Sequence, residues 1–279
     1  MQIGINTFGI AKLLSKDLDG TLERLREMGY TCLEPCIYFD GAFPRPVRAG
    51  LRLGLRIGGT YGGLWQQCYG AEELALRAKE RGFSVLSVHS FLPVGERGCR
   101  WLEEGAALLE RIGAKFLVIS PMKGSIREAE RLIPALREVS DLLHARGISL
   151  LLHNHAPEFT READGRTQAD VLLAAVPRLG LEPDTGWAQV ADQDPVQLVR
   201  TYAGRIGLLH LKDIAALQRH PRFTAIGEGI LPLKEVLRAA QGCALPEGGV
   251  IVDQDRSDGD LLRDLRTGFD NISHALADL

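Results

Sequence analysis

The sequence has few of the features that mark membrane, secreted or nucleic-acid-binding proteins. Its 279 residues contain no apolar run that approaches the roughly 20 residues needed to span a bilayer. The first residues, Met-Gln-Ile-Gly-Ile-Asn, lack the basic start and apolar core of a signal peptide. A formal net charge of -3 provides no basic excess for binding phosphate backbones. We therefore expect a cytoplasmic protein that binds neither nucleic acid nor a membrane.

Cysteine is also scarce, with five residues scattered along the chain. An odd number of dispersed cysteines is typical of reduced thiols rather than of a disulfide framework. Cys32 and Cys36 are four residues apart, but Pro35 excludes the helix that would carry both on one face. A zinc site built on this pair is therefore not expected.

Short apolar runs alternate with longer amphipathic segments, which is the pattern of repeated βα units around a parallel sheet. Eight runs are expected to form strands: Ile3–Asn6, Cys32–Ile37, Val85–Ser90, Phe116–Ser120, Ser149–His153, Gly180–Asp184, Gly207–Lys212 and Val250–Asp253. The segments expected to form helices include Leu18–Met28, Ala71–Arg81, Trp101–Ile112, Ile126–Ala145, Ala169–Ala175, Pro195–Tyr202, Pro232–Ala240 and Leu261–Leu276. Gly29 and Gly82 each follow such a segment, where a left-handed residue commonly ends a helix.

Eight βα units without a break in composition predict a single (β/α)8 barrel domain, a TIM barrel, over residues 1–279. The alternative is a doubly wound open sheet. However, nothing after Ile5 resembles the glycine-rich phosphate turn of that fold.

The segment 39–69, after the second strand, interrupts this rhythm. Long loops on the C-terminal face of a barrel are usually functional or mobile. We interpret it as a lid in which Trp65 and Tyr61 face a sugar, and an ordinary surface excursion is the alternative.

Polar side chains occur where the apolar runs end. They are Asn6, Glu34, His89, His153, His155, Asp184, His210, Lys212, Asp253 and Asp255, with Glu158 just beyond the fifth run. Barrel enzymes keep their chemistry at the C-terminal ends of the strands. One buried histidine is more often a hydrogen-bonded core residue than a ligand. Two histidines and two carboxylates from strands five to eight would be costly to bury without a cation. Such ligands suit Mn²⁺, Co²⁺, Zn²⁺ or Mg²⁺, so the sequence predicts a divalent metal site.

The segment His153-Asn154-His155-Ala156-Pro157-Glu158-Phe159 resembles the "HNHxxEF" signature of the sugar phosphate isomerase/epimerase family. This family belongs to the xylose isomerase-like TIM barrel group, which also contains inosose dehydratases, ketose 3-epimerases and endonuclease IV. Four further blocks resemble the family: Leu181–Ala188, Arg205–Asp213, Ile226–Pro232 and Ile251–Asp255. The resemblance is strong from His153 onward, diffuse before Cys36, and absent through residues 39–69.

The resemblance implies a divalent metal held by residues that end strands five to eight. Asp184 and His210 match the family's aspartate and histidine, and Asp253 stands where the family has a glutamate. The glutamate of strand five is missing. Either His153 replaces it as a nitrogen ligand, or Glu158 supplies the carboxylate from the loop. The resemblance also implies a small carbohydrate substrate and a homodimer or homotetramer.

A metal that chelates a carbonyl and the adjacent hydroxyl stabilises an enediolate, and nearby groups then move the proton. Our candidates for proton transfer are Glu158, Asp253, His155 and Lys212; a salt bridge from Lys212 to Asp213 or Asp184 is the alternative for that lysine. Our candidates for substrate binding are Glu34, His89, Trp65, Trp187 and Arg256, although Trp187 can equally pack as core and Arg256 can be an exposed surface residue.

The leading functional hypothesis is an isomerase or epimerase acting on a keto-sugar, sugar phosphate or cyclitol. A dehydratase acting on a keto-inositol or keto-glycoside comes second, because one such site serves both reactions. An endonuclease of the endonuclease IV type would need more metal ligands and a basic face. A sugar-binding barrel without catalysis is the remaining alternative.

Overall fold

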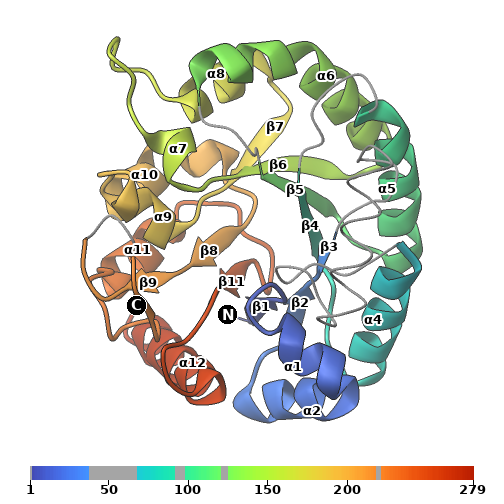
Figure 1. Ribbon diagram of the computed structural model, residues 1–279, viewed down its shortest axis with the longest axis vertical. Coiled ribbons are helices and arrows are strands. Elements are labelled where there is room, and N and C mark those ends of the chain that lie inside the picture. The colour runs from blue at the N-terminus through green and yellow to red at the C-terminus, as the bar shows by residue number, and fades with distance from the viewer. Residues whose placement is uncertain (1, 38–67, 92–97, 121–124, 218–220) are drawn as a thin grey trace.

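The computed structural model describes residues 2–37, 68–91, 98–120, 125–217 and 221–279 (Figure 1). Parallel strands line a central barrel and helices surround it, which confirms the predicted fold class. The barrel strands are β1 (Ile3–Asn6), β2 (Cys32–Glu34), β3 (Cys36–Ile37), β4 (Ser87–Phe91), β5 (Phe116–Ser120), β6 (Ser149–His153), β7 (Leu179–Glu182), β8 (Leu209–Leu211) and β11 (Val250–Val252).

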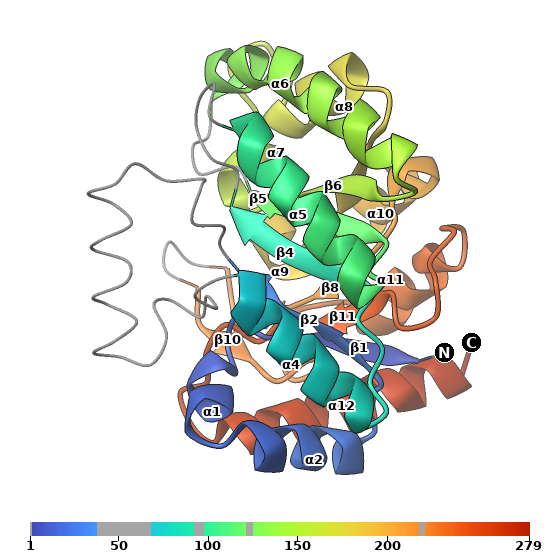
Figure 2. The same ribbon diagram turned by 90° about the vertical axis from the view of Figure 1, so that its right-hand side faces the viewer.

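The helices follow the strands in sequence and cover the outside of the barrel (Figure 2). They are α1 (Ala11–Lys16), α2 (Leu18–Met28), α4 (Cys68–Glu80), α5 (Gly98–Ile112), α6 (Ile126–Ala145), α7 (Ala156–Phe159), α8 (Gln168–Ala175), α9 (Thr185–Val190), α10 (Pro195–Thr201), η2 (Ala203–Arg205), α11 (Leu233–Ala240) and α12 (Leu261–Ala277). In the described part of the chain, none of the helices combines the length and apolarity that crossing a membrane requires.

Two hydrogen-bonded sheets close into one barrel. Their strand orders are β2-β1-β11-β8 and β3-β4-β5-β6-β7. At one seam, Pro35 lacks the N–H of an uninterrupted ladder, so the expected strand Cys32–Ile37 divides into β2, which pairs with β1, and β3, which pairs with β4. At the other seam, isolated parallel bridges join Leu181 to Ile206 and Asp184 to His210. The second bridge brings two predicted metal ligands side by side.

The ends of the chain also meet in this closure. Strand β1 pairs with β11, and helices α2 and α12 lie side by side in both views (Figures 1 and 2). The buried Tyr30 hydroxyl donates to the Leu265 carbonyl at 2.9 Å, which ties the segment after α2 to α12.

A small apolar layer fills the barrel below the polar strand ends. It consists of Val118, Leu151, Leu208 and Ile251, all buried in one cluster. Side chains two residues apart on a strand share a face, so the next inward positions toward the C-terminal ends are Ser120, His153, His210 and Asp253. Strand alternation therefore aims one histidine of the signature, and the two later ligands, at the barrel mouth.

Short helices follow two of these strands, although the sequence patterns predicted neither. Helix α7 has His155 as its N-cap, and α9 has Asp184, whose Oδ1 accepts a hydrogen bond from Trp187 N at 2.8 Å. A helix of four or six residues is too short to show an amphipathic period, which is why the patterns missed both. Residues 39–67, which include the expected lid with Tyr61 and Trp65, lie outside the described residues. Residues 68 and 69 belong to α4.

Asp213 is a structural residue at the mouth. A short antiparallel pair of β9 (Asp213–Ile214) and β10 (Phe223–Thr224) follows β8. The Asp213 carboxylate accepts hydrogen bonds from the backbone N–H groups of Gly227, Gly229 and Leu231 at 2.9–3.0 Å. Gly227 has φ of 87°, a conformation that suits glycine. The carboxylate therefore holds the loop before α11 in place.

We expect Asp213→Ala to lower the free energy of unfolding by about 2–4 kcal/mol, because several backbone donors would lose a charged acceptor. Urea denaturation measures the change. The matched control is Asp258→Ala. The Asp258 carboxylate is exposed and pairs with the exposed Arg222 at 3.2 Å, so its loss should cost less than about 0.5 kcal/mol. Equal losses in the two variants would show that the Asp213 hydrogen bonds contribute little.

Candidate metal centre

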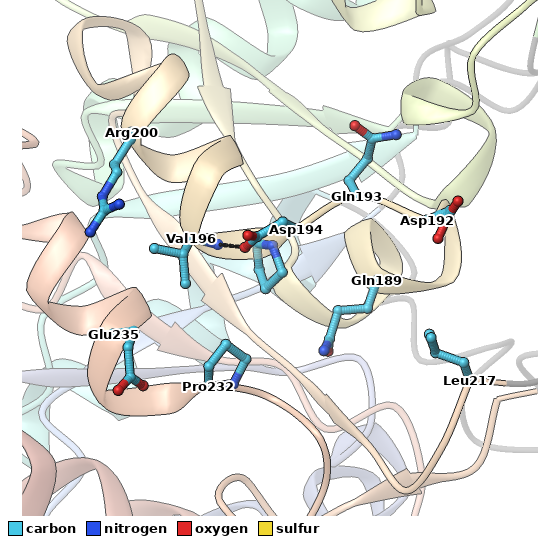
Figure 3. Close-up of a pocket in the computed structure, with 10 residues that line it drawn as sticks. Gln189, Asp192, Gln193, Asp194, Val196, Arg200, Leu217, Pro232 and Glu235 are labelled. Atoms are coloured by element: carbon cyan, nitrogen blue, oxygen red, sulfur yellow. Dashed lines mark hydrogen bonds between the residues drawn. The ribbon is translucent and has the colours of Figure 1, made fainter.

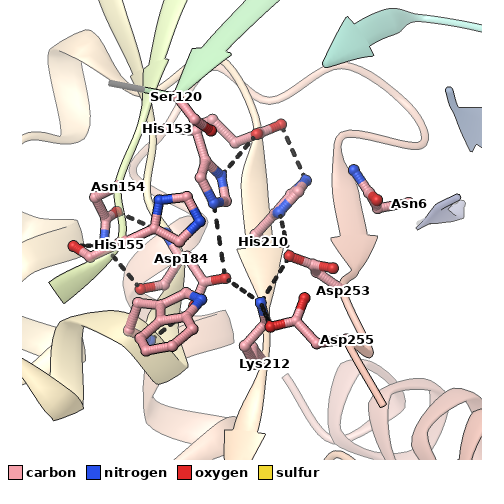
Figure 4. Close-up of polar contacts among 12 residues, drawn as sticks. Asn6, Ser120, His153, Asn154, His155, Asp184, His210, Lys212, Asp253 and Asp255 are labelled. Atoms are coloured by element: carbon pink, nitrogen blue, oxygen red, sulfur yellow. Dashed lines mark hydrogen bonds and ion pairs between the residues drawn. The ribbon is translucent and has the colours of Figure 1, made fainter. Parts of the chain in front are cut away.

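The four predicted ligands of strands five to eight come together in the structure. One ligand atom from each of His153, Asp184, His210 and Asp253 lies within 4.8 Å of the others, and all four residues are buried (Figure 4). We call these residues the outer group. His153 ends β6, His210 lies within β8, and Asp184 and Asp253 follow β7 and β11, so the parallel strands bring the four residues to one place.

A second group lies deeper and shares both histidines. His89, His153, Glu182 and His210 also bring ligand atoms within 4.8 Å of one another. We call these residues the inner group. His153 directs Nδ1 to Glu182 Oε2 at 3.2 Å and Nε2 to Asp184 Oδ2 at 4.0 Å. His210 directs Nε2 to Glu182 Oε1 at 3.3 Å and Nδ1 to Asp253 Oδ2 at 3.2 Å. Each imidazole therefore offers one nitrogen to each group.

Glu182 was missed as a site residue by the sequence reasoning. It is fully buried, and its two oxygens face both histidines. A usable signal was present, because Glu182 interrupts an apolar run expected to be buried and lies two residues before Asp184, on the same strand face. The strand ends two residues earlier than predicted, so Glu182 rather than Asp184 is its last residue.

Glu34 anchors the inner group from β2. Its Oε1 accepts hydrogen bonds from Asn6 Nδ2 at 2.7 Å and His210 Nε2 at 2.9 Å, and its Oε2 accepts one from the Ser87 hydroxyl. Burial raises the pKa of Glu34, but the charge and hydrogen bond of His210 outweigh it and hold the pKa below the usual value. The Glu34 carboxylate is therefore ionised and fixes the orientation of the His210 ring.

The protonation of the neighbouring groups follows from burial and from this charge. Burial raises the pKa of Glu182 well above its usual value, and the Glu34 carboxylate raises it further. Burial lowers the pKa of His153 well below its usual value, so that ring is neutral. Burial also lowers the pKa of His210, but the Glu182 and Glu34 carboxyls reverse the shift and raise it.

Lys212 lies among the carboxylates of the mouth. Its ammonium is 3.1 Å from Asp184 Oδ2, 2.9 Å from Asp253 Oδ2 and 2.9 Å from Asp255 Oδ2. The expected salt bridge to Asp184 is therefore present, whereas Asp213 binds backbone donors instead. Burial opposes the charged form of Lys212, but these carboxylates raise its pKa well above the usual value.

The two outer carboxyls differ in pKa. Burial raises the pKa of Asp184 to about 6 despite the Lys212 ammonium. For Asp253, the Lys212 ammonium and His210 outweigh burial and lower the pKa below its usual value. Asp253 is therefore the more strongly ionised of the two.

The donor set fits a divalent cation. Three buried carboxyl oxygens have no hydrogen bond of good geometry: Glu182 Oε1, Asp184 Oδ2 and Asp253 Oδ1. Asp184 Oδ2 remains in this class although Lys212 Nζ is 3.1 Å away. An unpartnered buried carboxylate oxygen is costly, and a cation satisfies it. Imidazole with carboxylate is a donor combination that Mn²⁺, Co²⁺ and Zn²⁺ accept.

A cavity of about 180 Å³ opens beside the outer group. Its described lining contains six residues that the sequence singled out for a role: His89, His153, His155, Trp187, Lys212 and Asp253. It also contains Asn6, Phe8, Cys36, Ser120 and Asp255, to which the sequence reasoning gave no role. The Ser120 hydroxyl lies 2.6 Å from His89 Nε2, which fixes the orientation of that ring.

The other predicted site residues are placed differently. The described lining includes neither the outer-group residues Asp184 and His210 nor Glu34, Glu158 and Arg256, and Trp65 lies outside the described residues. Glu158 is buried, and its Oε2 accepts a hydrogen bond from His155 N at 2.7 Å. Burial raises the pKa of Glu158 to about 7 and lowers the pKa of His155 to about 3. Arg256 is exposed and donates to the Pro221 carbonyl at 3.0 Å.

A larger groove, of about 680 Å³, lies between α9, α10 and α11 (Figure 3). Its acidic residues are Asp192, Asp194 and Glu235, and the Asp194 carboxylate caps α10 through Val196 N at 2.8 Å. Among the described residues, none of these acids joins a group of three or more metal-type ligands. Of these two cavities, the smaller one therefore adjoins the metal-type ligands found among the described residues.

Comparison with known proteins agrees with the barrel fold. The xylose isomerase-like TIM barrel family matches residues 22–244. An inosose dehydratase of Geobacillus kaustophilus is 28% identical over 167 residues, which are 50% of this chain and 53% of that protein. The chain thus matches about half the length of this curated relative.

Two solved structures are similar along nearly their whole length. A sugar phosphate isomerase/epimerase from Parabacteroides distasonis superposes with a TM-score of 0.72 and 19% identity, covering 96% of this chain and 92% of its own. A xylose isomerase-like TIM barrel protein from Mycobacterium smegmatis, in complex with magnesium, gives a TM-score of 0.71 and 15% identity, covering 99% and 97%. At these identities the likeness shows the fold. With the family match over most of its length, the chain belongs to the xylose isomerase-like TIM barrel family.

Proposed function

We propose that the protein is a divalent-cation-dependent isomerase or epimerase that acts on a keto-sugar, sugar phosphate or cyclitol through an enediolate. The observation that carries the proposal is the outer group: two imidazoles and two carboxylates converge, with buried carboxyl oxygens that lack hydrogen-bond partners, beside a polar cavity. The magnesium in the Mycobacterium smegmatis relative and the name of the Parabacteroides distasonis relative support it.

In this proposal His153, Asp184, His210 and Asp253 hold the cation. Glu158 is the alternative ligand from the fifth strand's loop, but its Oε2 already accepts the His155 N–H, which favours His153. When bound, Mn²⁺, Co²⁺, Zn²⁺ or Mg²⁺ supplies Lewis-acid stabilisation of negative charge on substrate oxygens. Asp184 suits the role, because its Oδ1 caps α9 and holds the carboxylate in place while Oδ2 stays without a hydrogen bond.

Proton transfer falls to groups around the cavity. His155 lines the cavity as a neutral imidazole and can accept a proton from a substrate carbon. Glu158 is not among the described lining residues, but its carboxyl accepts the backbone N–H of His155, and its pKa of about 7 suits a group that alternates between acid and base near neutral pH. Asp253 remains ionised beside Lys212, and the Lys212 ammonium can donate a hydrogen bond to a substrate oxygen. Trp187 and His89 form walls that orient the sugar.

Dehydration is the second candidate reaction, and the inosose dehydratase relative favours it. Both reactions begin by removal of a proton next to a carbonyl, so the same cavity residues serve either. They diverge at the next step. In epimerisation the proton returns to the opposite face of the same carbon, in isomerisation it goes to the former carbonyl carbon, and in dehydration a hydroxyl leaves the carbon β to the carbonyl. The residues that decide between these outcomes contact the substrate away from the cation.

Solvent-isotope incorporation tests the proposal. Protein loaded with Mn²⁺ is incubated in D₂O with a panel of ketoses, ketose phosphates and keto-inositols, and products are followed by NMR and mass spectrometry. We expect one deuterium on a carbon next to the carbonyl, with all hydroxyls retained. An unsaturated ketone would instead establish the dehydratase. Product formation equal to that of chelator-treated protein across the panel would rule out both reactions for these substrates.

A further inference from the structure

The position of the Lys212 ammonium conflicts with that of a bound cation. Its Nζ contacts Asp184 Oδ2 at 3.1 Å and Asp253 Oδ2 at 2.9 Å, and these oxygens belong to the carboxyls of the outer group. The lysine side chain is only 2% exposed, so solvent screens its charge little. A divalent cation on the same carboxylates would lie next to a unit positive charge, and their repulsion in this buried place is many times the thermal energy.

The structure offers the ammonium another partner. Asp255 Oδ2 is 2.9 Å from Lys212 Nζ, and the Asp255 side chain is 18% exposed, which makes it the most accessible of the three carboxylates around the lysine. Among the described residues, Asp255 belongs to neither the inner nor the outer group. The rings of Trp187 and Phe223 also face the ammonium at 5.5 and 5.3 Å, which favours a positive charge on this side of the cavity.

We propose that the Lys212 ammonium competes with the cation for Asp184 and Asp253, and that Asp255 retains the ammonium when the cation binds. Asp255 is then a positioning residue. It lowers the cost of cation entry and keeps Lys212 inside the cavity, where the ammonium reaches substrate oxygens. The inference rests on the cation of the proposed function, but not on which reaction the protein catalyses.

The competition makes opposite predictions for the two residues. Removing the ammonium should tighten cation binding, because Asp184 and Asp253 no longer have a competing charge. Removing the Asp255 carboxylate should weaken binding, because Lys212 then stays on the two ligand carboxylates. Loss of one negative charge would also weaken binding by itself. The two causes can be separated in a variant that lacks the Lys212 ammonium, because there only the loss of the Asp255 charge can weaken cation binding.

The experiment titrates chelator-stripped protein with MnCl₂ and measures free Mn²⁺ by electron paramagnetic resonance. The set is the wild-type protein, Lys212→Met, Asp255→Asn, the double variant, and Asp258→Asn as a control for charge on the same segment. Asp258 is exposed and pairs with Arg222. Circular dichroism verifies that each variant is folded. Lys212→Gln provides a second, polar replacement in case the Met side chain disturbs the buried site.

We expect Lys212→Met and Lys212→Gln to lower the Kd for Mn²⁺ by at least about tenfold. Asp255→Asn should raise the Kd about tenfold in the wild-type protein but less than about threefold when Lys212 is absent. Asp258→Asn should leave it unchanged. An unchanged or raised Kd in both lysine variants, or equal effects of Asp255→Asn in the two backgrounds, would overturn the inference alone. No Mn²⁺ binding by any of the proteins would overturn the proposed cation centre as well.

Discussion

Replacing Asp184 with Asn and His210 with Ala together should leave the protein unable to retain a divalent cation through dialysis. The two residues are bridged through the barrel seam and both belong to the outer group. The double replacement removes one carboxylate and one imidazole of the four predicted ligands, which leaves too few for a stable site. Elemental analysis after dialysis against metal-free buffer measures the retained cation, with the Mn²⁺-loaded wild-type protein as the reference.

Activity should fall with the cation. Lewis-acid stabilisation is worth several kcal/mol in a transition state, so turnover should drop by about a thousandfold or more. Added Mn²⁺ at high concentration should not restore it, because the ligand atoms are gone. This resistance to rescue distinguishes loss of the site from a simple decrease in affinity.

The matched control carries the same changes outside the site. Asp192 and His274 are both exposed, and Asp192 has φ of 59°, which asparagine tolerates well. Asp192→Asn with His274→Ala should retain one equivalent of cation and full turnover. Stoichiometric metal in the Asp184/His210 variant would refute the outer group as the binding site, and it would also count against the inner group, because His210 belongs to both.

Three members of the outer group were predictable from strand geometry, although the choice between His153 and Glu158 after strand five stayed open. In a parallel barrel, a polar residue at the end of an apolar run faces either the barrel mouth or its wall. Side chains alternate between the two faces of a strand, so the position of the residue in the strand decides which. His153, His210 and Asp253 each lie two residues beyond a member of the apolar layer, and the structure places them together. Knowledge of eight strands was therefore sufficient to bring these side chains into contact.

The contacts of the inner group could not be derived in this way. Glu182, the last residue of β7, was passed over because it lies in a run expected to be apolar, and Glu34, the last residue of β2, was expected to bind substrate rather than to hold His210. Their roles depend on which ring nitrogen of His210 faces each carboxyl, and a sequence carries no information on ring orientation. The same holds for Lys212, whose three carboxylate partners come from after β7 and after β11. The sequence suggested Asp184 as one partner of Lys212, but only the interatomic distances identify all three.

The buried carboxyls of Glu34 and Glu182 lead to a second prediction with a large expected effect. The environment lowers the pKa of Glu34 and raises that of Glu182. We therefore infer that in the cation-free protein the negative charge of this pair resides on Glu34 and the proton on Glu182. Glutamine resembles the neutral form of glutamic acid in shape, but it cannot carry the negative charge of the carboxylate. Glu34→Gln should therefore be far more damaging than Glu182→Gln, although both side chains are fully buried.

We expect Glu34→Gln to lower the free energy of unfolding by about 3–5 kcal/mol at pH 7, the usual cost of breaking a buried ion pair from one side. His210 would lose its anionic acceptor, and Asn6 and Ser87 would face an amide. Glu182→Gln should cost less than about 1.5 kcal/mol, because a neutral group replaces a neutral group. Urea denaturation of chelator-stripped protein measures both changes. Glu247→Gln is the control, because Glu247 is an exposed glutamate that accepts a hydrogen bond from Gln2.

The pH dependence gives an independent check of the assignment. A carboxyl whose pKa is lowered by folding contributes stability that is present above its unfolded pKa and lost as the pH falls through the folded value. The difference in stability between the wild-type protein and Glu34→Gln should therefore be constant above pH 4.5, the ordinary value for glutamate, and shrink below it. For Glu182 the sign is opposite. Because folding raises its pKa, its carboxyl contributes to stability at low pH, and this contribution is lost as the pH rises. A larger loss from Glu182→Gln than from Glu34→Gln at pH 7 would mean that the anion resides on Glu182, and that Glu182 rather than Glu34 holds the His210 ring.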